Sequence, residues 1–306
     1  MTVLIITNKE DLTADWVVRE LRDREVSFLR LNSEDLPKGK ATWDSETSEM
    51  LIETAEGRVV VERDIRSVWY RRPGRPFGDR PQPDSPDAVL NAQWRALLDA
   101  LALTSSARWV NHPQANSAAE SKIKQLRAAS AAGLSFPQTL VSNDPSAISR
   151  FCDRVGDVVV KALDAPLVVV DNTEAFMFTT QLTRDYLHPE SLTPAPLIFQ
   201  ERVEPRTDIR VTVVGDQLFT ARAVGVTAQD WRLESTPVPF EPIDIDVAIQ
   251  RACISLVRSL NLTFGAIDLI ASESGIQFLE INPNGEWGWL QARGFPIASA
   301  LVDVLV

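Results

Sequence analysis

The stretch FLEINPNGEWGW, residues 278–289, combines the pattern of a buried strand with oxygen-bearing side chains. Its apolar residues are typical of a strand, yet Glu280 and Asn282 place a carboxylate and an amide within the same run. Residues 283–285, Pro-Asn-Gly, then predict a turn that ends the strand. Buried polar groups are costly unless they find partners, so this stretch is the first candidate for a binding site.

Residues 264–285 predict a β-hairpin that ends in this stretch. Two apolar runs are separated by residues 273–275, and a three-residue loop that ends in Gly is a common hairpin connection. With this loop, we expect Asp268 to lie directly opposite Glu280. Because side chains alternate along a strand, Asn282 shares a face with Glu280. Three oxygen-bearing side chains are therefore expected to converge on one side of an apolar hairpin.

Two opposed carboxylates repel each other, so the pair of Asp268 and Glu280 needs a compensating group. They can share a proton, pair with Lys or Arg, or bind a hard cation. Mg²⁺ takes carboxylate oxygens and usually keeps waters and substrate phosphates in its shell. The competing interpretation is an ion-paired, partly solvated face. The predicted register and the nearby amide of Asn282 favour the cation site.

The composition is that of an ordinary globular protein, with 306 residues, 44% hydrophobic and 24% charged. The net charge of −11 argues against a general nucleic-acid role. The N-terminus lacks the basic region of a signal peptide, and no stretch is long enough to span a bilayer. Cys152 and Cys253 show no paired spacing, which fits a reducing compartment. We therefore expect a soluble cytoplasmic protein.

The chain as a whole predicts a mixed α/β protein of three lobes, spanning residues 1–110, 111–200 and 201–306. The first lobe is expected to open with a strand at 3–7, a helix at 9–24 and a strand at 26–32. A hairpin at 50–63, a strand running into a loop at 65–76 and a helix at 85–105 follow. Ser85 is the expected N-cap of that helix. The second lobe has expected helices at 118–132 and from Asp144, and expected strands at 139–143, 157–163 and 196–204. The third has strands within 208–225, a helix at 246–260, the hairpin and a terminal helical segment.

The pattern of Asp268 followed by Glu280-x-Asn282 resembles the metal-binding end of the ATP-grasp ligases. More narrowly, FLEINPNGEWGW is similar to the graspetide-forming, microviridin-type peptide macrocyclases. Three further stretches resemble the same family, namely VWYRRPGRP (68–76), ESKIKQLRAASAAGLSFPQTLVSNDP (120–145) and FQERVEPRTDIRVTVVGDQLFTARA (199–223). The resemblance implies an ATP-grasp fold with an N-terminal pre-ATP-grasp α/β domain, a small central α+β lobe and a C-terminal α+β lobe.

The resemblance also implies an ATP and Mg²⁺ site made of particular residues of this chain. ATP phosphates would be contacted by Lys122 and Lys161. The adenine pocket would be lined by Gln200, Glu201 and Val203, and the ribose would be held by Asp208. Phosphate or the activated carboxylate would be contacted by Arg210 and Arg222. Mg²⁺ would be held by Asp268, Glu280 and Asn282.

Several of these residues have a structural interpretation as well. Lys161 lies in an apolar strand, where an edge lysine can extend its amine to water, and Lys122 alone would be a solvated helix residue. Arg210 and Arg222 lie on apolar strands and need anionic partners, either phosphate or a structural carboxylate. Residues 158–182 contain no Gly, unlike the phosphate loop of many ATP-grasp proteins, so residues that cradle phosphate between 163 and 178 are not identified.

Other residues are left open or assigned to packing. Arg71, Arg72 and Arg75 form a local basic patch that is either a solvated loop or a contact for an acidic peptide. The pair at 231–232, Trp-Arg, is a weaker candidate for substrate contact. The two tryptophans at 287 and 289 are expected to pack rather than to take part in chemistry.

The resemblance implies an ATP-dependent peptide macrocyclase. It would phosphorylate Asp or Glu side chains of a ribosomal precursor peptide, with a leader and an acidic core, and join them to Thr or Ser hydroxyls or Lys amines. The absence of a nucleophile motif agrees with catalysis by positioning and electrostatics. A homodimer is also implied. The alternatives are a carboxylate-amine ligase that adds an amino acid to a peptide or protein, and a nucleotide-binding regulatory module without turnover.

Overall fold

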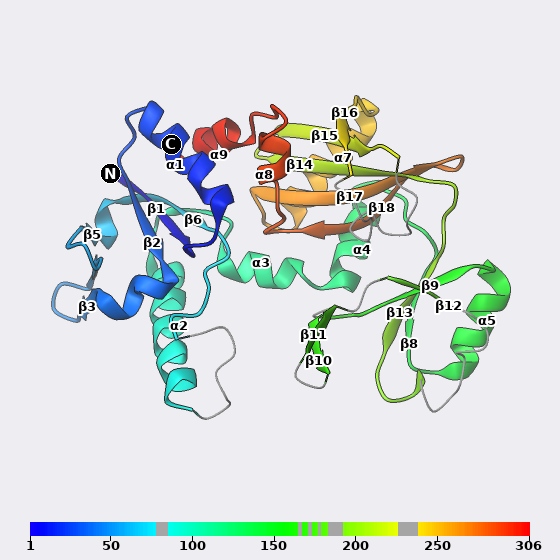
Figure 1. Ribbon diagram of the computed structural model, residues 1–306, viewed down its shortest axis with the longest axis horizontal. Coiled ribbons are helices and arrows are strands. Elements are labelled where there is room, and N and C mark those ends of the chain that lie inside the picture. The colour runs from blue at the N-terminus through cyan, green and yellow to red at the C-terminus, as the bar shows by residue number, and fades with distance from the viewer. Residues whose placement is uncertain (78–84, 165–166, 171–172, 177–178, 183–191, 226–237) are drawn as a thin grey trace.

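A computed structural model of the protein describes residues 1–77, 85–164, 167–170, 173–176, 179–182, 192–225 and 238–306. The N-terminal lobe lies to one side of the central and C-terminal lobes (Figure 1). Its main sheet is parallel with strand order β2-β1-β6-β7, which are Phe28–Asn32, Thr2–Thr7, Ile65–Tyr70 and Arg108–Val110. The helices that accompany it are α1 (Leu12–Asp23) and α2 (Pro86–Thr104). The predicted β-α-β opening is confirmed.

A second, antiparallel sheet completes the N-terminal lobe. Its strands are β3 (Lys40–Asp44), β4 (Glu49–Glu53) and β5 (Val59–Val61), with the 3-10 turns η1 (Ser33–Lys38) and η2 (Glu62–Asp64) beside them. The β4–β5 pair is the hairpin expected at 50–63. Ser85 caps α2 as predicted, since its hydroxyl accepts a hydrogen bond from the Ala88 amide at 3.2 Å.

The helix expected over 118–132 is two helices, α3 (Pro113–Ala119) and α4 (Lys122–Ala131). The prediction of one helix was wrong because Ser121 is extended, with φ −61° and ψ 109°. The carbonyl of Ala119 accepts instead from the Gln125 side chain, at 2.7 Å. Gly133 ends α4 as predicted, and its φ of +90° lies in the left-handed region that favours Gly.

The central lobe has a four-stranded antiparallel sheet of order β12-β9-β13-β8, with α5 (Pro145–Val155) packed on it. Its strands are Thr180–Leu182, Val158–Lys161, Leu197–Glu201 and Thr139–Ser142. A separate pair is formed by β10 (Leu167–Val170) and β11 (Thr173–Phe176). A small cluster that includes Ile148, Phe151 and Phe199 forms the core of this lobe.

The C-terminal lobe is built on a five-stranded antiparallel sheet of order β16-β15-β14-β17-β18. These strands are Phe240–Pro242, Gln217–Ala223, Thr207–Val214, Phe264–Ser272 and Gly275–Asn282. Helices α4 and α7 (Val247–Ser259) contribute to the hydrophobic cluster on one face of this sheet. The chain ends with α8 (Gly288–Gln291) and α9 (Ile297–Leu305).

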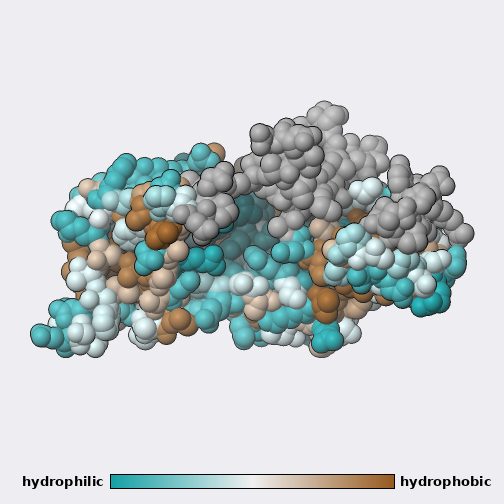
Figure 2. Space-filling model, turned by 90° about the horizontal axis from the view of Figure 1, so that it is seen from below, coloured by the Kyte–Doolittle hydropathy of each residue, from teal (hydrophilic) through white to brown (hydrophobic). Residues whose placement is uncertain are grey.

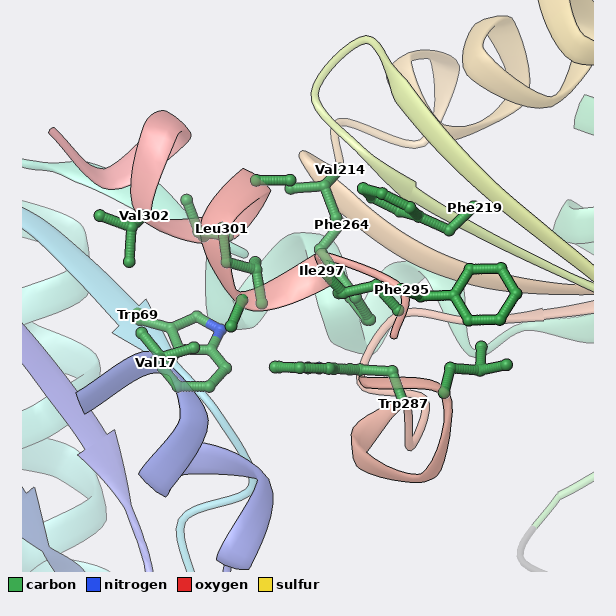
Figure 3. Packing of buried hydrophobic residues seen from close by; sticks show 14 of the residues in the cluster. Val17, Trp69, Val214, Phe219, Phe264, Trp287, Phe295, Ile297, Leu301 and Val302 are labelled. Carbon is green, nitrogen blue, oxygen red and sulfur yellow. The ribbon is translucent and has the colours of Figure 1, made fainter. Parts of the chain in front are cut away.

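The N-terminal and C-terminal lobes share one hydrophobic cluster. Figure 3 shows Leu301 of α9 between Trp69 of the N-terminal lobe and Phe264 of the C-terminal sheet. Trp287 is fully buried in the same cluster, and Trp289 packs against Phe240 with ring centroids 4.5 Å apart. The prediction that both tryptophans pack is therefore confirmed, and the end of the chain joins two lobes.

The β17–β18 hairpin turns one residue earlier than predicted. Ser272 pairs with Gly275, so that the loop has two residues instead of three. Gly275 adopts a φ of +102°, which is accessible to Gly and allows the early return. A bulge at Leu279 then shifts the register, and Asp268 lies opposite Glu280 as expected. The predicted loop was wrong, while the predicted pair of carboxylates is confirmed.

Candidate functional site

A cleft lies between the central sheet and the C-terminal sheet, and it brings together most of the predicted site residues. Those that line it are Lys161, Gln200, Glu201, Val203, Asp208, Arg210, Asp268 and Glu280. They come from β9, β13, the segment after β13, β14 and the β17–β18 hairpin. In Figure 2, hydrophilic residues also line a recess between the N-terminal lobe and the other two lobes. Segments distant in sequence therefore build one polar site.

On the central side, the Lys161 amine is held by a buried glutamine. Lys161 Nζ donates to Gln200 Oε1 at 2.7 Å, and Gln200 Nε2 donates to Thr139 Oγ1 at 3.0 Å. Gln200 is 3% exposed. These bonds run across the adjacent strands β9, β13 and β8, and they fix an ammonium group in the lining of the cleft.

Where the chain passes from the central to the C-terminal lobe, its residues form short-range hydrogen bonds and ion pairs. Glu201 donates its amide to the Gln138 carbonyl at 2.8 Å and accepts the Gln138 amide on its carboxylate at 3.1 Å. Further on, Arg206 Nε lies 3.3 Å from Asp208 Oδ1, with both side chains largely buried. Val203, between these pairs, is half-buried in the cleft lining.

On the C-terminal side, two carboxylates stand between two cations. Arg210 Nε lies 2.9 Å from Asp268 Oδ1, and the two residues are direct neighbours on β14 and β17. Asp268 faces Glu280 across β17 and β18. Lys122 Nζ donates to Glu280 Oε2 at 2.6 Å. The order is Arg210, Asp268, Glu280, Lys122, so a cation at each end of the row balances the two adjacent carboxylates.

Helix α4 brings Lys122 to this row because Gln125 anchors the helix to the edge of β18. Gln125 Nε2 donates to the Ile281 carbonyl at 2.9 Å, and Gln125 Oε1 accepts from the Ile281 amide at 3.2 Å. Gln125 is 1% exposed. Sequence reasoning missed this residue, since nothing in the pattern of α4 distinguishes it from a surface glutamine.

Three of the predicted site residues do not line the cleft, namely Lys122, which reaches Glu280 from α4, Asn282 and Arg222. Asn282 lies exposed at the end of β18, where its Oδ1 accepts from the Asn284 amide at 2.9 Å. Arg222 is half-exposed and lies 3.4 Å from Glu241. Direct cross-strand partners share a face, so Arg222, opposite Ile209, points away from the face of Arg210. The structure therefore does not bring the two arginines together.

Arg71 is a site residue whose setting the sequence left open. It is 1% exposed, and its Nη1 donates to the carbonyl groups of Asn284 at 2.6 Å and Gly285 at 3.0 Å. Its Nη2 donates to Glu286 at 2.7 Å. Burial, followed by the charge of Arg72, lowers the pKa of the Arg71 guanidinium. Arg71 is therefore not a solvated member of a basic patch but a bonded partner of the turn after Asn282.

The oxygen donors of the hairpin fit a magnesium ion. Asp268 and Glu280 offer carboxylates from adjacent strands, and Asn282 offers an amide at the strand end. Mg²⁺ is usually held by one or two carboxylates together with substrate phosphates. Within the residues that the structure describes, no group of three or more His, Cys, Asp or Glu side chains is placed to hold a metal. The candidate set is thus an open one that relies on ligands from a substrate.

Some sequence predictions fall outside the described residues. These are the Trp-Arg pair at 231–232 and part of the region 163–178, for which the sequence identifies no phosphate-cradling residues. Cys152 and Cys253 are buried in different clusters and do not pair with each other; burial raises the pKa of Cys253 to about 12. Among the described helices, none has the length and apolar character needed to cross a membrane.

Comparisons with known proteins identify the family of this chain. Residues 119–305 match the family model of the RimK-like ATP-grasp domain, and residues 2–116 match that of the MvdD pre-ATP grasp domain. A curated relative is the tetrahydromethanopterin:alpha-L-glutamate ligase of Methanocaldococcus jannaschii. It is 27% identical over 113 residues, which are 35% of this chain and 38% of that protein. The match therefore spans well under half of that relative.

Solved structures match over nearly the whole chain. The macrocyclase MdnC from Microcystis aeruginosa MRC, bound with precursor peptide MdnA, has a TM-score of 0.88 and 27% identity, covering 100% of this chain and 99% of that one. A RiPP-associated ATP-grasp ligase of Chryseobacterium gregarium, in complex with ADP and a leader and core peptide, has a TM-score of 0.87 and 26% identity. It covers 99% of this chain and 96% of that one.

Proposed function

Because this chain belongs to the RimK-like ATP-grasp family, we propose that it is an ATP-dependent peptide macrocyclase. It would use ATP and Mg²⁺ to activate Asp or Glu side chains of a precursor peptide and join them to Thr or Ser hydroxyls or Lys amines of the same peptide. The observation that carries the proposal is the row of Arg210, Asp268, Glu280 and Lys122 beside a cleft that also holds Lys161.

The residues of the cleft suit the parts of an ATP molecule. We assign Lys161 and Lys122 to the phosphates, because ammonium groups near a site of carboxylates can neutralise phosphate charge. Backbone and side-chain groups of Gln200, Glu201 and Val203 would line the adenine pocket, and Asp208 would accept from the ribose hydroxyls. In the present arrangement each of the two lysines is bonded to a side chain of the site, so both would exchange that partner for phosphate oxygens.

A metal ion would be held by Asp268, Glu280 and Asn282, and Arg210 would contact the transferred phosphoryl group or the activated carboxylate. When bound, Mg²⁺ supplies charge neutralisation for the γ-phosphoryl group during its transfer. The chain's own contribution is to hold the peptide carboxylate in line with that group and to exclude water from the product. Transfer gives an acyl phosphate and ADP. Attack by the hydroxyl or amine then forms the ester or amide and releases phosphate.

The cleft encloses about 90 Å³, which is below the roughly 300–1,000 Å³ of typical ligand pockets. A nucleotide therefore has to displace side chains that now close the cleft. The pairs Lys161–Gln200 and Arg206–Asp208 cross its lining and are the contacts that would open. We infer that ATP binding rearranges these pairs.

The proposed substrate is a ribosomal peptide with a leader and an acidic core. This is supported by the likeness, at 27% and 26% identity, to structures that contain a precursor peptide or a leader and core peptide. The exposed guanidinium of Arg72, beside Asn284 and Glu286, offers a contact for an acidic core. A homodimer is part of the proposal, and light scattering of the purified chain tests it.

The second candidate is a carboxylate-amine ligase that adds an amino acid to a peptide or protein. The relative that is a glutamate ligase favours it. Both candidates share the ATP and Mg²⁺ site, and they differ in whether the nucleophile comes from the same molecule.

Mass spectrometry of acidic precursor peptides after incubation with the protein, ATP and Mg²⁺ separates the two. We expect the loss of one water per cross-link, and no loss with Asp268→Asn. Asp216→Asn is the matched control, since Asp216 pairs with Arg258 on the exposed surface away from the cleft. A mass gain equal to an added amino acid would instead favour the carboxylate-amine ligase. ATP binding with no change in any peptide would contradict both.

A further inference from the structure

The turn after Asn282 is bonded to the N-terminal lobe through its backbone. Arg71, which follows β6, donates Nη1 to the carbonyl groups of Asn284 and Gly285 at 2.6 and 3.0 Å. Arg72 Nε donates to the same Asn284 carbonyl at 2.9 Å. A guanidinium group has its donors in a fixed plane, so two or more bonds define the orientation of the groups that accept them.

A third residue of the N-terminal lobe extends this set of bonds to the start of the turn. Asn111, which follows β7, donates Nδ2 to the Pro283 carbonyl at 2.9 Å and is 3% exposed. Consecutive carbonyl groups of residues 283–285 therefore accept hydrogen bonds from the N-terminal lobe. The turn follows the C-terminal sheet in sequence, but the other lobe supplies donors to three of its carbonyl groups in succession.

The turn also orients the side chain of Asn282, the proposed metal ligand. The Asn284 amide donates to Asn282 Oδ1 at 2.9 Å, and this amide shares its peptide plane with the Pro283 carbonyl that Asn111 bonds. Arg71 and Arg72 bond the next peptide plane of the turn, at the Asn284 carbonyl. No side chain fits at Gly285, where an added Cβ would lie 2.3 Å from Ala266 Cβ and 3.4 Å from Arg210 Nη1. The turn is closely packed against the row of charges.

The carboxylate of Glu286 completes the connection. It accepts from Arg71 Nη2 at 2.7 Å, from the Thr13 hydroxyl of α1, and from the amide of Gly288 at 2.9 Å. Arg71 Nε also lies 3.4 Å from Asp11 Oδ2. Arg71 is thus held between carboxylates of both lobes, and its position does not depend on a single contact.

We propose that Arg71 is a positioning residue of the Mg²⁺ site, which holds the turn at residues 284–286 and so fixes the Asn284 amide that orients the Asn282 side chain. The inference rests on the proposed function, because it requires Asn282 to be a metal ligand. Groups that orient a metal ligand typically change metal affinity by about 10–100-fold when they are replaced. Arg71→Lys keeps the charge but replaces the two guanidinium nitrogens, one on the carbonyl groups and one on Glu286, with a single amine.

Arg24→Lys is a matched control that separates positioning from a general link between lobes. Arg24 also joins α1 to the end of the chain, with Nη1 2.6 Å from Asp303 Oδ1 and Nη2 3.2 Å from the Ser299 carbonyl. It makes none of the bonds to residues 282–286 described above. A loss of lobe contact alone would therefore affect both variants, whereas a loss of ligand orientation would affect only Arg71→Lys.

The experiment measures binding of Mn²⁺, as a spectroscopic substitute for Mg²⁺, by electron paramagnetic resonance in the presence of saturating ADP. Metal-free ADP binding and the thermal unfolding midpoint are measured in parallel. We expect Arg71→Lys to raise the Mn²⁺ dissociation constant by about 10-fold or more, with ADP binding equal to that of Arg24→Lys. Arg72→Ala, which removes one exposed donor to Asn284, is expected to raise it by a smaller factor and serves if Arg71→Lys does not fold.

The outcomes distinguish the inference from the function on which it rests. If Arg71→Lys bound Mn²⁺ as tightly as the wild type, the positioning role alone would be overturned. The same holds for Arg72→Ala if Arg71→Lys does not fold. A parallel weakening in Arg71→Lys and Arg24→Lys would also overturn it, in favour of a structural link. If the wild-type chain bound ADP but no Mn²⁺, the metal site itself would be wrong, and the role of Arg71 would fall with it.

Discussion

Asp268 and Glu280 show how single residues of the site depend on their neighbours. Each carboxylate has its own cation, Arg210 for Asp268 and Lys122 for Glu280. The two pairs differ in exposure, since the side chains of Arg210 and Asp268 are 7% and 16% exposed and those of Lys122 and Glu280 are 32% and 36% exposed. Loss of one partner of the inner pair therefore leaves a buried charge unpaired, whereas the outer pair is exposed enough to exchange partners.

Asp268→Asn is expected to lower the free energy of unfolding by roughly 3 kcal/mol, because it leaves the Arg210 charge buried beside a neutral group. Urea unfolding measures this. The double variant Arg210→Met/Asp268→Leu is expected to recover most of the loss, since no charge is left unpaired. Asp216→Asn, at an exposed pair, should change stability by less than about 1 kcal/mol. Equal effects of Asp268→Asn and Asp216→Asn would contradict the prediction.

Glu286 gives the turn a dependence on pH. Burial alone would raise the pKa of Glu286, but Arg71, the Thr13 hydroxyl and the Gly288 amide together hold it below its usual 4.5. A carboxyl group whose folded pKa is depressed stabilises the protein above its unfolded pKa and loses that effect as pH falls through the folded pKa. Stability should therefore fall below about pH 4.5, and the fall should be shallower in Glu286→Gln. Unfolding midpoints measured from pH 3 to 7 test this, and identical slopes would contradict it.

The sequence predicted these residues unequally, for a physical reason. The pairing of Asp268 with Glu280 depends on local alternation and a short loop, and it was predicted correctly. The partners of Arg71 lie more than 200 positions away in the chain, at Asn284, Gly285 and Glu286. Local patterns carry no information on contacts of that range, so Arg71 was left as part of a basic patch.

Among helices and strands, α4 and the β17–β18 hairpin form the unit that builds the site. Periodicity predicted that both exist, but not where they break. The hairpin loop was predicted one residue too long, and the bulge at Leu279 compensated for that error. The helix expected at 118–132 is interrupted at Ser121, because α4 is aligned by its contact with the edge of β18 rather than by its own propensity. Tertiary contacts set both features.

Gln125→Leu is expected to destabilise the protein by about 2–4 kcal/mol, because it leaves the Ile281 amide and carbonyl and the Ala119 carbonyl without this partner. It should also displace Lys122 from Glu280 and weaken ATP binding. Urea unfolding and calorimetric titration with ATP measure the two effects. Gln93→Leu, at an exposed position of α2, is the matched control and should change neither. A stable Gln125→Leu with normal ATP affinity would contradict the prediction.

For the whole molecule, the predicted ATP-grasp fold is confirmed by the family match over residues 119–305 and by the macrocyclase structure that covers the full chain. The boundaries at residues 110 and 200 stay predictions. The shared cluster of the N-terminal and C-terminal lobes could not be inferred from the sequence. The apolar residues of α9 show that the helix is buried, but they do not show which lobes it packs against. The central lobe has its own cluster around Phe151.

Leu301→Ala should therefore weaken two lobes at once. The buried Leu301 lies in the shared cluster, and Leu→Ala in a core costs roughly 2–5 kcal/mol. Hydrogen exchange should show faster exchange in both β1 and β14, while α5 and β9 of the central lobe stay as protected as in the wild type. Faster exchange in the C-terminal strands alone would indicate that the lobes do not share stability.

The bonds from Arg71, Arg72 and Asn111 to residues 283–285 also restrict how such chains can be recombined. In a chimera whose first lobe comes from another parent protein, the hydrogen-bond donors come from one parent and the turn that accepts from them comes from the other. The central sheet with α5, residues 139–201, carries its own core and contains none of these donors, so it can be exchanged without separating the partners. Breakpoints for engineered hybrids should therefore keep the first lobe through Asn111 and the last two dozen residues from the same parent, although they are the two ends of the chain.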